Sequence, residues 1–449
     1  MADTTGNTSE KATGTPHDPG SAPRKSSWRY IGPGIVVAAT GVGAGDLVAT
    51  LIAGSSFGYT LLWAAVLGCL VKISLAEAAG RWHLSTGRTL FDGWASLGRW
   101  TTWFFAFYVV IWGFTYGAAA MSSSALPLQA LFPGVMDLEW WGVACGVVGL
   151  VFVWFNKYAV FEKVMTVLVG VMFVVTVYLA IRVAPNLGDA FAGLLPVIPD
   201  GEDSVLNTLG LIGGVGGTIT LAAYGYWVNA KGWANTGWMK VMRLDNRVAY
   251  ITTGVFVVAM LFVGAELLHA ADIALSGGGK GLVQLGDILE DEYGTATAKF
   301  FLIGFFATSF TSLIGVWHGV SLMFADFVSR LRERRADGAG GTAGGAKEIA
   351  TGEHERSWPF RVYLLWLTFP PVILLFQGEP FRLVIIYGVL GAAFMPFLAL
   401  TLVWLLNSSR TPAEWRNGWL SNGMLTVAGL LFLVLCVKEI WDQRWADFF

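Results

Sequence analysis

Long apolar blocks constrain this chain more than any other feature of its sequence. Hydrophobic residues make up 55% of the 449 residues and charged residues only 13%, whereas a soluble globular protein carries about 25% charged residues. The apolar residues gather in blocks of about 20 or more, the length that spans a hydrocarbon core of about 30 Å. Backbone groups at that depth must be satisfied within the block, so the blocks are expected to be helices. The sequence therefore predicts an all-α integral membrane protein.

We expect about eleven membrane-spanning helices. Their expected ranges are 30–54, 57–80, 101–128, 139–155, 159–183, 205–230, 247–270, 298–328, 359–376, 380–406 and 417–440. They form one transporter domain over residues 28–440, preceded by a disordered cytoplasmic tail (1–27) that lacks the apolar core of a signal peptide. Residues 331–357 begin with arginines and continue through GAGGTAGGA, which predicts a flexible cytoplasmic linker.

The charges between the spans alternate in sign along the chain. The connections after even-numbered spans hold Arg81, Arg88, Arg99, Lys157, Lys163, Lys231, Lys240, Arg243, Arg247, Arg330, Arg332, Arg334, Arg335, Arg410 and Arg416. Those after odd-numbered spans hold Asp137, Glu139, Asp189, Asp200, Glu202, Asp203, Asp272, Asp287, Glu290, Asp291, Glu292 and Glu379. Because basic residues stay on the cytoplasmic side, the pattern predicts a multi-pass protein of the inner (cytoplasmic) membrane with a cytoplasmic N-terminus.

Two of the expected spans contain glycine runs that make poor continuous helices. The first span holds Thr40-Gly-Val-Gly-Ala-Gly-Asp46, and the sixth holds Gly213-Gly-Val-Gly-Gly-Thr-Ile-Thr220. Each interior glycine costs about 1 kcal/mol relative to alanine, so both spans are predicted to unwind near the middle. Interrupted helices at matching positions indicate two inverted repeats, about 30–183 and 205–406, with a substrate site between them. The alternative is that the glycines only allow close helix packing.

Asp46 is the only ionisable residue of the first span. A carboxylate at the bilayer centre costs at least about 2.5–3.5 kcal/mol on insertion scales, so it needs a partner or a function. A carboxylate together with carbonyl oxygens freed by unwinding forms a shell suited to a hard cation. The candidate ligands are Asp46, Thr40, Gly43, Gly216, Thr220 and Thr218. The alternative role for Asp46 is an N-cap on the second half of the first span.

Three further polar residues of the expected spans need an explanation, and two of them allow more than one. Lys72 in the second span is predicted to pair with Asp46, to meet Glu77 or to extend to the interface. His318 in the eighth span is a candidate proton relay or a hydrogen-bonded packing histidine. Asp326, near the inner end of that span, is expected to be a solvated end charge.

The sequence contains no motif for nucleotide binding or zinc hydrolysis. Neither GxxxxGK[ST] nor HExxH occurs, and no soluble stretch is long enough for an ATPase domain. We therefore expect a secondary transporter rather than an enzyme, with no cofactor and no nucleic-acid partner. Its partners would be the transported cation and the lipid bilayer.

The first two spans carry a family resemblance. Gly32-Pro-Gly, the run Ala53-Gly-Ser-Ser-Phe-Gly-Tyr-Thr-Leu-Leu-Trp63 and Ser85-Thr-Gly-Arg-Thr-Leu90 resemble the Nramp family of divalent metal transporters. Segments 306–315 and 383–397 also resemble their Nramp counterparts, so the likeness covers most of residues 30–405. The resemblance implies the LeuT-type fold of two inverted five-helix repeats, with the last span, 417–440, outside them.

The sequence departs from that family at the residues that would hold the metal. The family's metal-binding aspartate falls at Gly43 and its asparagine at Asp46, while its Met-Pro-His segment falls at Ile219-Thr220-Leu221. Its glutamine in the tenth span falls near Gly388, and residues 101–136 lack the carboxylates of proton-coupled members. Without the soft methionine, selection of Mn²⁺ or Fe²⁺ over Mg²⁺ or Ca²⁺ should weaken. The pattern is similar to the Nramp-related branch that includes magnesium transporters.

The sequence is compatible with three functions. The first is a divalent-cation transporter that works by alternating access, with a site favouring Mg²⁺ or another hard cation. The second is a LeuT-type transporter of a small organic solute such as an amino acid or amine. The third is a membrane sensor or scaffold whose linker, 331–357, binds a partner.

Overall fold

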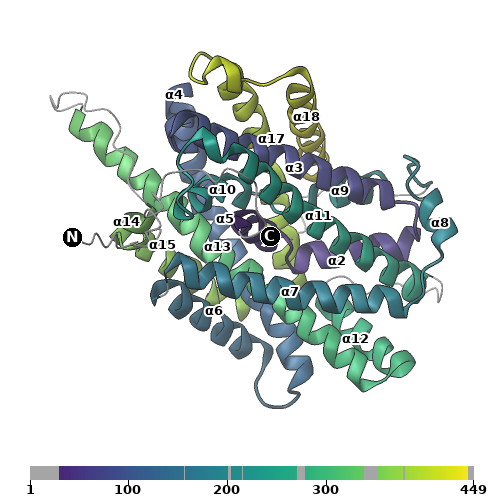
Figure 1. Cartoon of the computed structure of the whole chain (residues 1–449). Helices are drawn as coiled ribbons and strands as arrows, with labels where there is room; N and C mark the ends of the chain where they lie inside the picture. Colours follow the sequence, from purple (N-terminus) through teal and green to yellow (C-terminus); the bar gives the residue numbers. More distant parts are fainter. Residues whose placement is uncertain are drawn as a thin grey trace, which may run out of the picture.

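A computed structural model describes residues 30–155, 157–200, 204–214, 216–269, 279–337, 351–377 and 380–442 (Figure 1). Every regular element in these ranges is helical. The predicted tail (1–27) and residues 338–350 of the predicted linker (331–357) lie outside the described residues. The all-α prediction is confirmed for the part of the chain that the structure covers.

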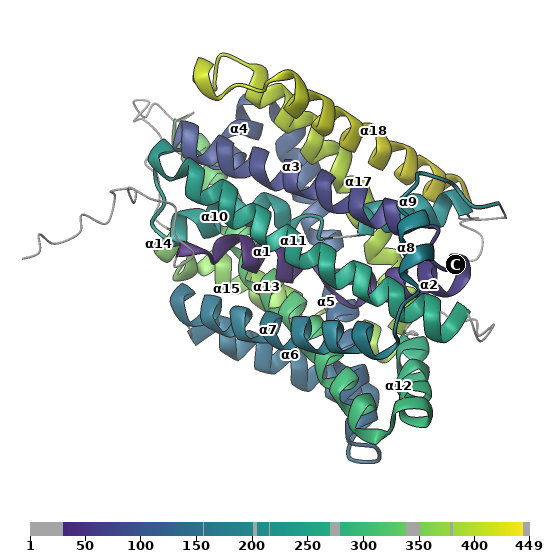
Figure 2. The same cartoon turned by 45° about the vertical axis from the view of Figure 1, so that its right-hand side comes forward.

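Seven helical segments among the described residues are long and apolar enough to cross a bilayer. They are Leu62–Thr86 (α3), Arg99–Leu131 (α5), Leu138–Phe155 (α6), Tyr158–Arg182 (α7), Thr236–His269 (around α11, Met239–Val263), Thr295–Glu333 (in α13, Thr295–Asp337) and Trp358–Leu375 (α15, Trp358–Thr368, and α16, Val372–Leu375). Two more helices, α17 (Pro380–Asn407) and α18 (Trp419–Asp442), pack against each other along one side of the bundle (Figure 2). These nine elements match nine of the eleven expected spans.

The remaining two expected spans are each divided into two helices. The first consists of α1 (Pro33–Gly41) and α2 (Ala44–Phe57), and the sixth of α9 (Ser204–Gly214) and α10 (Thr220–Ala230). Both interruptions fall within the glycine runs, so the predicted breaks are confirmed. The α1 helix packs against α7, α10, α11 and α13, which places the first break inside the bundle (Figure 2).

Several boundaries differ from the sequence-based ranges. The α11 helix begins at Met239 rather than near 247, so Lys240, Arg243 and Arg247 lie on a helix and not in a connection. In the ninth span, α15 ends at Thr368. Pro370 and Pro371 follow shortly after, and because proline has no backbone N–H they cannot continue its hydrogen bonds. Short helices that were not predicted are α4 (Leu90–Leu97), α8 (Leu187–Ala192), α12 (Gly279–Tyr293) and α14 (Thr351–Glu355).

The connections that follow even-numbered spans meet at one end of the bundle, here called the basic end (81–99, 231–238, 326–337, 354–357 and 408–418). Arg81 donates to the Trp415 carbonyl at 3.1 Å, and Arg410 donates to the Ser96 carbonyl at 2.9 Å. At the opposite end the Trp63 indole donates to the Val197 carbonyl at 2.9 Å. This grouping agrees with the predicted alternation of spans, and which end faces the cytoplasm stays a prediction.

Candidate substrate site

The two helix breaks meet in the interior of the bundle. A Cβ atom added to Gly41, at the end of α1, would lie 2.3 Å from the Gly216 carbonyl carbon and 2.5 Å from the Gly217 nitrogen. Gly216 and Gly217 have φ angles of 80° and 90°, a region in which side-chain-bearing residues are strained. Glycine at these three positions therefore allows the first and sixth spans to touch backbone to backbone.

Carbonyl groups at the breaks receive hydrogen bonds from neighbouring helices. The Ser312 hydroxyl on α13 donates to the Thr40 carbonyl at 2.9 Å, and the Tyr250 hydroxyl on α11 donates to the Gly216 carbonyl at 3.3 Å. The Lys72 ammonium on α3 donates to the Gly217 carbonyl. The breaks thus present oxygen acceptors toward side chains from three different helices.

Besides Gly216, three of the predicted ligands lie directly at the breaks. Thr40 is buried, and its hydroxyl donates to the Val37 carbonyl at 2.7 Å, so its carbonyl is the group that faces the break. The buried Gly43 lies between α1 and α2. Thr220 begins α10, and its buried hydroxyl oxygen has no hydrogen-bond partner among the described residues. A buried hydroxyl without a partner is uncommon in proteins and is often explained by a water or an ion.

Asp46 is the third residue of α2, and its side chain lies outside the described residues. The amide of Leu47 donates to the Gly43 carbonyl at 3.2 Å, and this is the first turn of α2. The interpretation of Asp46 as the N-cap is therefore wrong, because that position falls at Gly43. A carboxylate in the first turn of a helix is favoured by the helix dipole, so Asp46 is at a position where a negative charge is stabilised.

The two secondary candidates from the sixth and second spans also lie near the breaks. Thr218 is half-buried and faces α17, where a Cβ on Gly391 would lie 3.3 Å from the Thr218 hydroxyl oxygen. Lys72 is completely buried and reaches the sixth-span break instead of the interface, so the predicted extension to the interface is wrong. Glu77 forms ion pairs with Arg81 at 3.1 Å and Arg243 at 2.9 Å.

His318 lies closer to the basic end than to the breaks. Its Nδ1 atom is 3.0 Å from the Trp227 indole nitrogen, and its Nε2 atom is 3.0 Å from a Glu355 carboxylate oxygen. Because an indole N–H can only donate, Nδ1 is the acceptor and Nε2 carries the proton toward Glu355. Protonation of Nδ1 would break the bond to Trp227, so these contacts favour the packing role over the proton relay.

Sequence reasoning missed the residues that hold the breaks from the neighbouring helices. Tyr116 on α5 lies 2.8 Å from the Ser312 hydroxyl. Since the single proton of Ser312 goes to the Thr40 carbonyl, Tyr116 is the donor in this pair. Ser312 belongs to the serine- and threonine-rich segment 307–312, which was a detectable signal. Tyr116 had none, because it is one of 12 tyrosines in an aromatic-rich chain.

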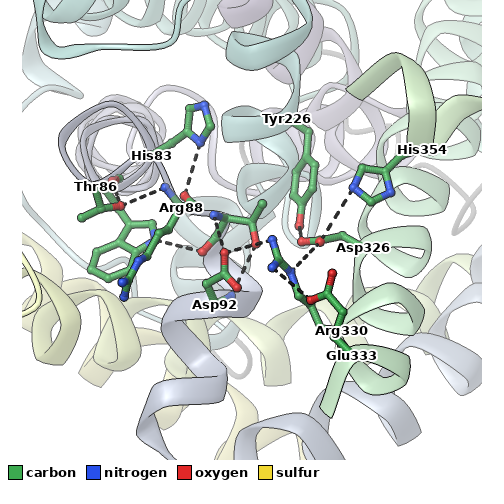
Figure 3. Close-up of polar contacts among 11 residues, drawn as sticks. His83, Thr86, Arg88, Asp92, Tyr226, Asp326, Arg330, Glu333 and His354 are labelled. Carbon is green, nitrogen blue, oxygen red and sulfur yellow. Dashed lines mark hydrogen bonds and ion pairs between the residues drawn. The ribbon is translucent and has the colours of Figure 1, made fainter. Parts of the chain in front are cut away.

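A second polar cluster lies at the basic end (Figure 3). Asp326 accepts hydrogen bonds from Tyr226 at 2.6 Å and from Arg330 at 3.2 Å. Arg330 also pairs with Asp92 on α4 at 3.1 Å, and His354 on α14 lies 3.8 Å from Asp326. Asp326 is completely buried, so its expected role as a solvated end charge is wrong. The cluster joins α4, α10, α13 and α14.

We predict that acidification weakens the contact of α14 with this cluster. Burial lowers the pKa of His354 below its usual value, although the nearby Asp326 carboxylate opposes that shift. A histidine whose pKa is lowered by folding contributes stability above its usual pKa of about 6.5, and this stability is lost as the pH falls through the lowered value. Hydrogen exchange of residues 351–357, corrected for intrinsic rates, should therefore accelerate between pH 7.5 and pH 5, and His354→Gln should remove the change. An identical change in the variant would contradict the assignment.

Three comparisons relate the chain to known proteins. The sequence model of the family described as natural resistance-associated macrophage protein-like matches residues 34–442. The divalent metal cation transporter MntH of Mycobacterium leprae is 25% identical, over 92% of this chain and 94% of that protein. A crystal structure of the Eremococcus coleocola manganese transporter matches with a TM-score of 0.77 at 16% identity, covering 96% of this chain and 90% of that one.

The structural likeness extends to a transporter of another family. Mhp1, a nucleobase-cation-symport-1 family transporter solved with bromovinylhydantoin bound, matches with a TM-score of 0.58 at 15% identity over 95% of each chain. At these identities the solved structures establish the fold alone. The predicted LeuT-type fold is confirmed, and the bounds of its two repeats stay a prediction.

Proposed function

Because this chain belongs to the Nramp family, we propose that it is a secondary transporter that carries a divalent metal cation across the membrane by alternating access. The observation that supports this most directly is the meeting of two interrupted helices inside the bundle, with backbone carbonyls at both breaks. Interrupted helices of this kind form the midplane substrate sites of secondary transporters. The Mycobacterium leprae relative is a divalent metal cation transporter, which agrees with the proposal.

The proposed metal ligands all supply oxygen. They are the Asp46 carboxylate, the carbonyls of Thr40, Gly43 and Gly216, and the hydroxyl of Thr220, with Thr218 as a further candidate. The support from the fold is that Thr40, Gly43 and Gly216 lie in or beside the breaks, and that the buried Thr220 hydroxyl has no partner among the described residues. Oxygen ligands without a thioether favour hard cations such as Mg²⁺ over softer transition metals.

The orientation is part of the same proposal. The basic end would face the cytoplasm, because it carries the arginine-rich connections that the positive-inside rule assigns to that side. The N-terminus would then also be cytoplasmic, and the protein would cross the inner membrane many times. Modification of single introduced cysteines by a membrane-impermeant thiol reagent, at Asp137 for the acidic end and Arg410 for the basic end, tests the assignment.

Asp46→Ala should reduce divalent-cation uptake into proteoliposomes to background. Removal of the only carboxylate in the proposed shell takes away its main negative charge, and losing one partner of a buried charge interaction costs about 3–5 kcal/mol, a factor of at least about 100 in affinity. Asp137→Ala, at an exposed position between α5 and α6, is the matched control and should transport normally. Competition among Mg²⁺, Mn²⁺, Ca²⁺ and Zn²⁺ identifies the preferred ion. Unchanged uptake by Asp46→Ala would refute the ligand assignment.

A second function, transport of a small organic solute, is favoured by one observation. The buried Lys72 ammonium beside the breaks would attract an anionic group as readily as it would repel a divalent cation. Calorimetric titration with Mg²⁺, Mn²⁺ and a panel of amino acids and amines separates the two functions. Saturable binding of a solute without any metal would support the second.

A further inference from the structure

The Lys72 side chain occupies an unusual position in the sixth-span break. It extends from α3, is completely buried, and donates from its ammonium to the Gly217 carbonyl. Its Cγ atom lies 3.6 Å from the position that a Cβ on Gly216 would take, so the aliphatic stem runs along the break. The centroid of the Phe432 ring on α18 is 5.1 Å from the ammonium.

Two neighbours of this ammonium, a backbone carbonyl at a helix break and an aromatic ring, are groups that also occur at cation sites. Carbonyl oxygens of unwound membrane helices bind monovalent cations in transporters, and the face of an aromatic ring attracts a cation within about 6 Å of its centroid. A buried ammonium otherwise costs several kcal/mol, and a lysine in a membrane helix usually extends to the interface instead. The inward direction of Lys72 therefore indicates that a positive charge is needed beside the Gly217 carbonyl.

We propose that the Lys72 ammonium is a tethered monovalent cation that permanently fills a cation position at the Gly217 carbonyl. The transporter then needs no free Na⁺ or K⁺ at this position to hold the sixth-span break in its transport-competent form. This inference rests on the proposed function in one respect, because its activity assay measures uptake of a divalent cation.

One feature of the neighbouring helices agrees with this role. The α18 helix, which lies outside the two predicted repeats, packs against α3 and α9 and places Phe432 over the ammonium. The last helix thus covers a charge that belongs to the centre of the bundle.

Chemical rescue tests the proposal. Lys72→Ala removes the tethered charge and leaves a space that a propylammonium ion matches in length and charge. We expect uptake by this variant to fall at least about tenfold, the effect of losing one hydrogen bond to a charged group, and to recover when propylammonium or Na⁺ is added. Wild-type uptake should be the same in Na⁺, K⁺ or N-methylglucamine. A wild-type requirement for Na⁺ or K⁺ overturns the proposal, and this measurement does not depend on any variant folding.

A matched lysine and a stability readout complete the design. Lys231→Ala removes a lysine that pairs with Glu162 at the basic end, and it should gain nothing from propylammonium. Propylammonium should also raise the thermal unfolding temperature of detergent-solubilised Lys72→Ala but not of Lys231→Ala. If propylammonium stabilises Lys72→Ala but the wild-type protein takes up no divalent cation, the role of Lys72 as a tethered cation is supported and the proposed transport function is refuted. If Lys72→Met takes up the divalent cation at the wild-type rate with N-methylglucamine as the only added monovalent cation, the proposed role of the Lys72 ammonium is refuted.

Discussion

Gly41→Ala should eliminate transport, although it adds only one methyl group to the chain. The new Cβ would lie 2.3 Å from the Gly216 carbonyl carbon and 2.5 Å from the Gly216 oxygen and the Gly217 nitrogen. All three are backbone atoms, so no side chain can rotate away, and the two breaks must separate. Overpacking a well-packed interior costs about 1–3 kcal/mol, and a clash with backbone on both sides belongs at the upper end of that range.

Uptake into proteoliposomes, together with the thermal unfolding temperature in detergent, measures this effect. Gly170→Ala is the matched control, because Gly170 lies on an exposed face of α7 and its Cβ would meet nothing within 4 Å. That substitution should preserve uptake and slightly raise stability, since alanine is favoured over glycine in a helix by about 1 kcal/mol. Uptake by Gly41→Ala within a factor of two of wild type would mean that contact between the breaks is dispensable.

Asp326→Asn should be the most destabilising single change at the basic end. Asp326 is completely buried and holds Tyr226 at 2.6 Å and Arg330 at 3.2 Å (Figure 3). Removal of one member of a buried ion pair typically costs about 3–5 kcal/mol, and we expect about 3 kcal/mol because Arg330 retains Asp92. The thermal unfolding temperature should fall clearly, and residues 351–357 should exchange amide hydrogens faster.

Glu333→Gln provides the control on the same arginine. Glu333 pairs with Arg330 at 3.3 Å, but its side chain is 44% exposed, and exposed ion pairs contribute about 0–1 kcal/mol. The two substitutions each remove one negative charge next to one guanidinium, so the difference between their losses of stability measures the burial of Asp326 together with its additional contacts to Tyr226 and His354. Equal losses of stability in the two variants would show that charge number, and not burial, sets the strength of this cluster.

Sequence reasoning predicted the features that depend on local composition. The apolar blocks predicted the helices, and the glycine runs predicted both breaks, because helix propensity and membrane burial act within a few residues of chain. Loop charges likewise predicted which connections share an end. The α11 boundary was wrong because Lys240, Arg243 and Arg247 were counted as connection, although charged residues are compatible with a helix that extends beyond the membrane.

The features that were missed depend on contacts between distant segments. Lys72 donates to the carbonyl of Gly217, which is 145 residues away in the sequence. Asp326 accepts from the hydroxyl of Tyr226, which is 100 residues away. Nothing in the immediate neighbourhood of either residue distinguishes a buried, bonded charge from one that reaches the interface. The same limit applies to Ser312, whose importance follows only from its contact with the Thr40 carbonyl, 272 residues earlier.

The length of α13 has a mechanical consequence. This single helix carries Ser312, which holds the first break, and Arg330, which holds the basic-end cluster. The two positions are separated by 18 residues (330 minus 312), or about 27 Å of helix at about 1.5 Å per residue. A rod pivoting at Ser312 by about 10° would carry Arg330 sideways by about 5 Å, more than a hydrogen bond tolerates. A small reorientation of α13 at the first break would therefore be sufficient to break the Arg330–Asp92 ion pair at the basic end.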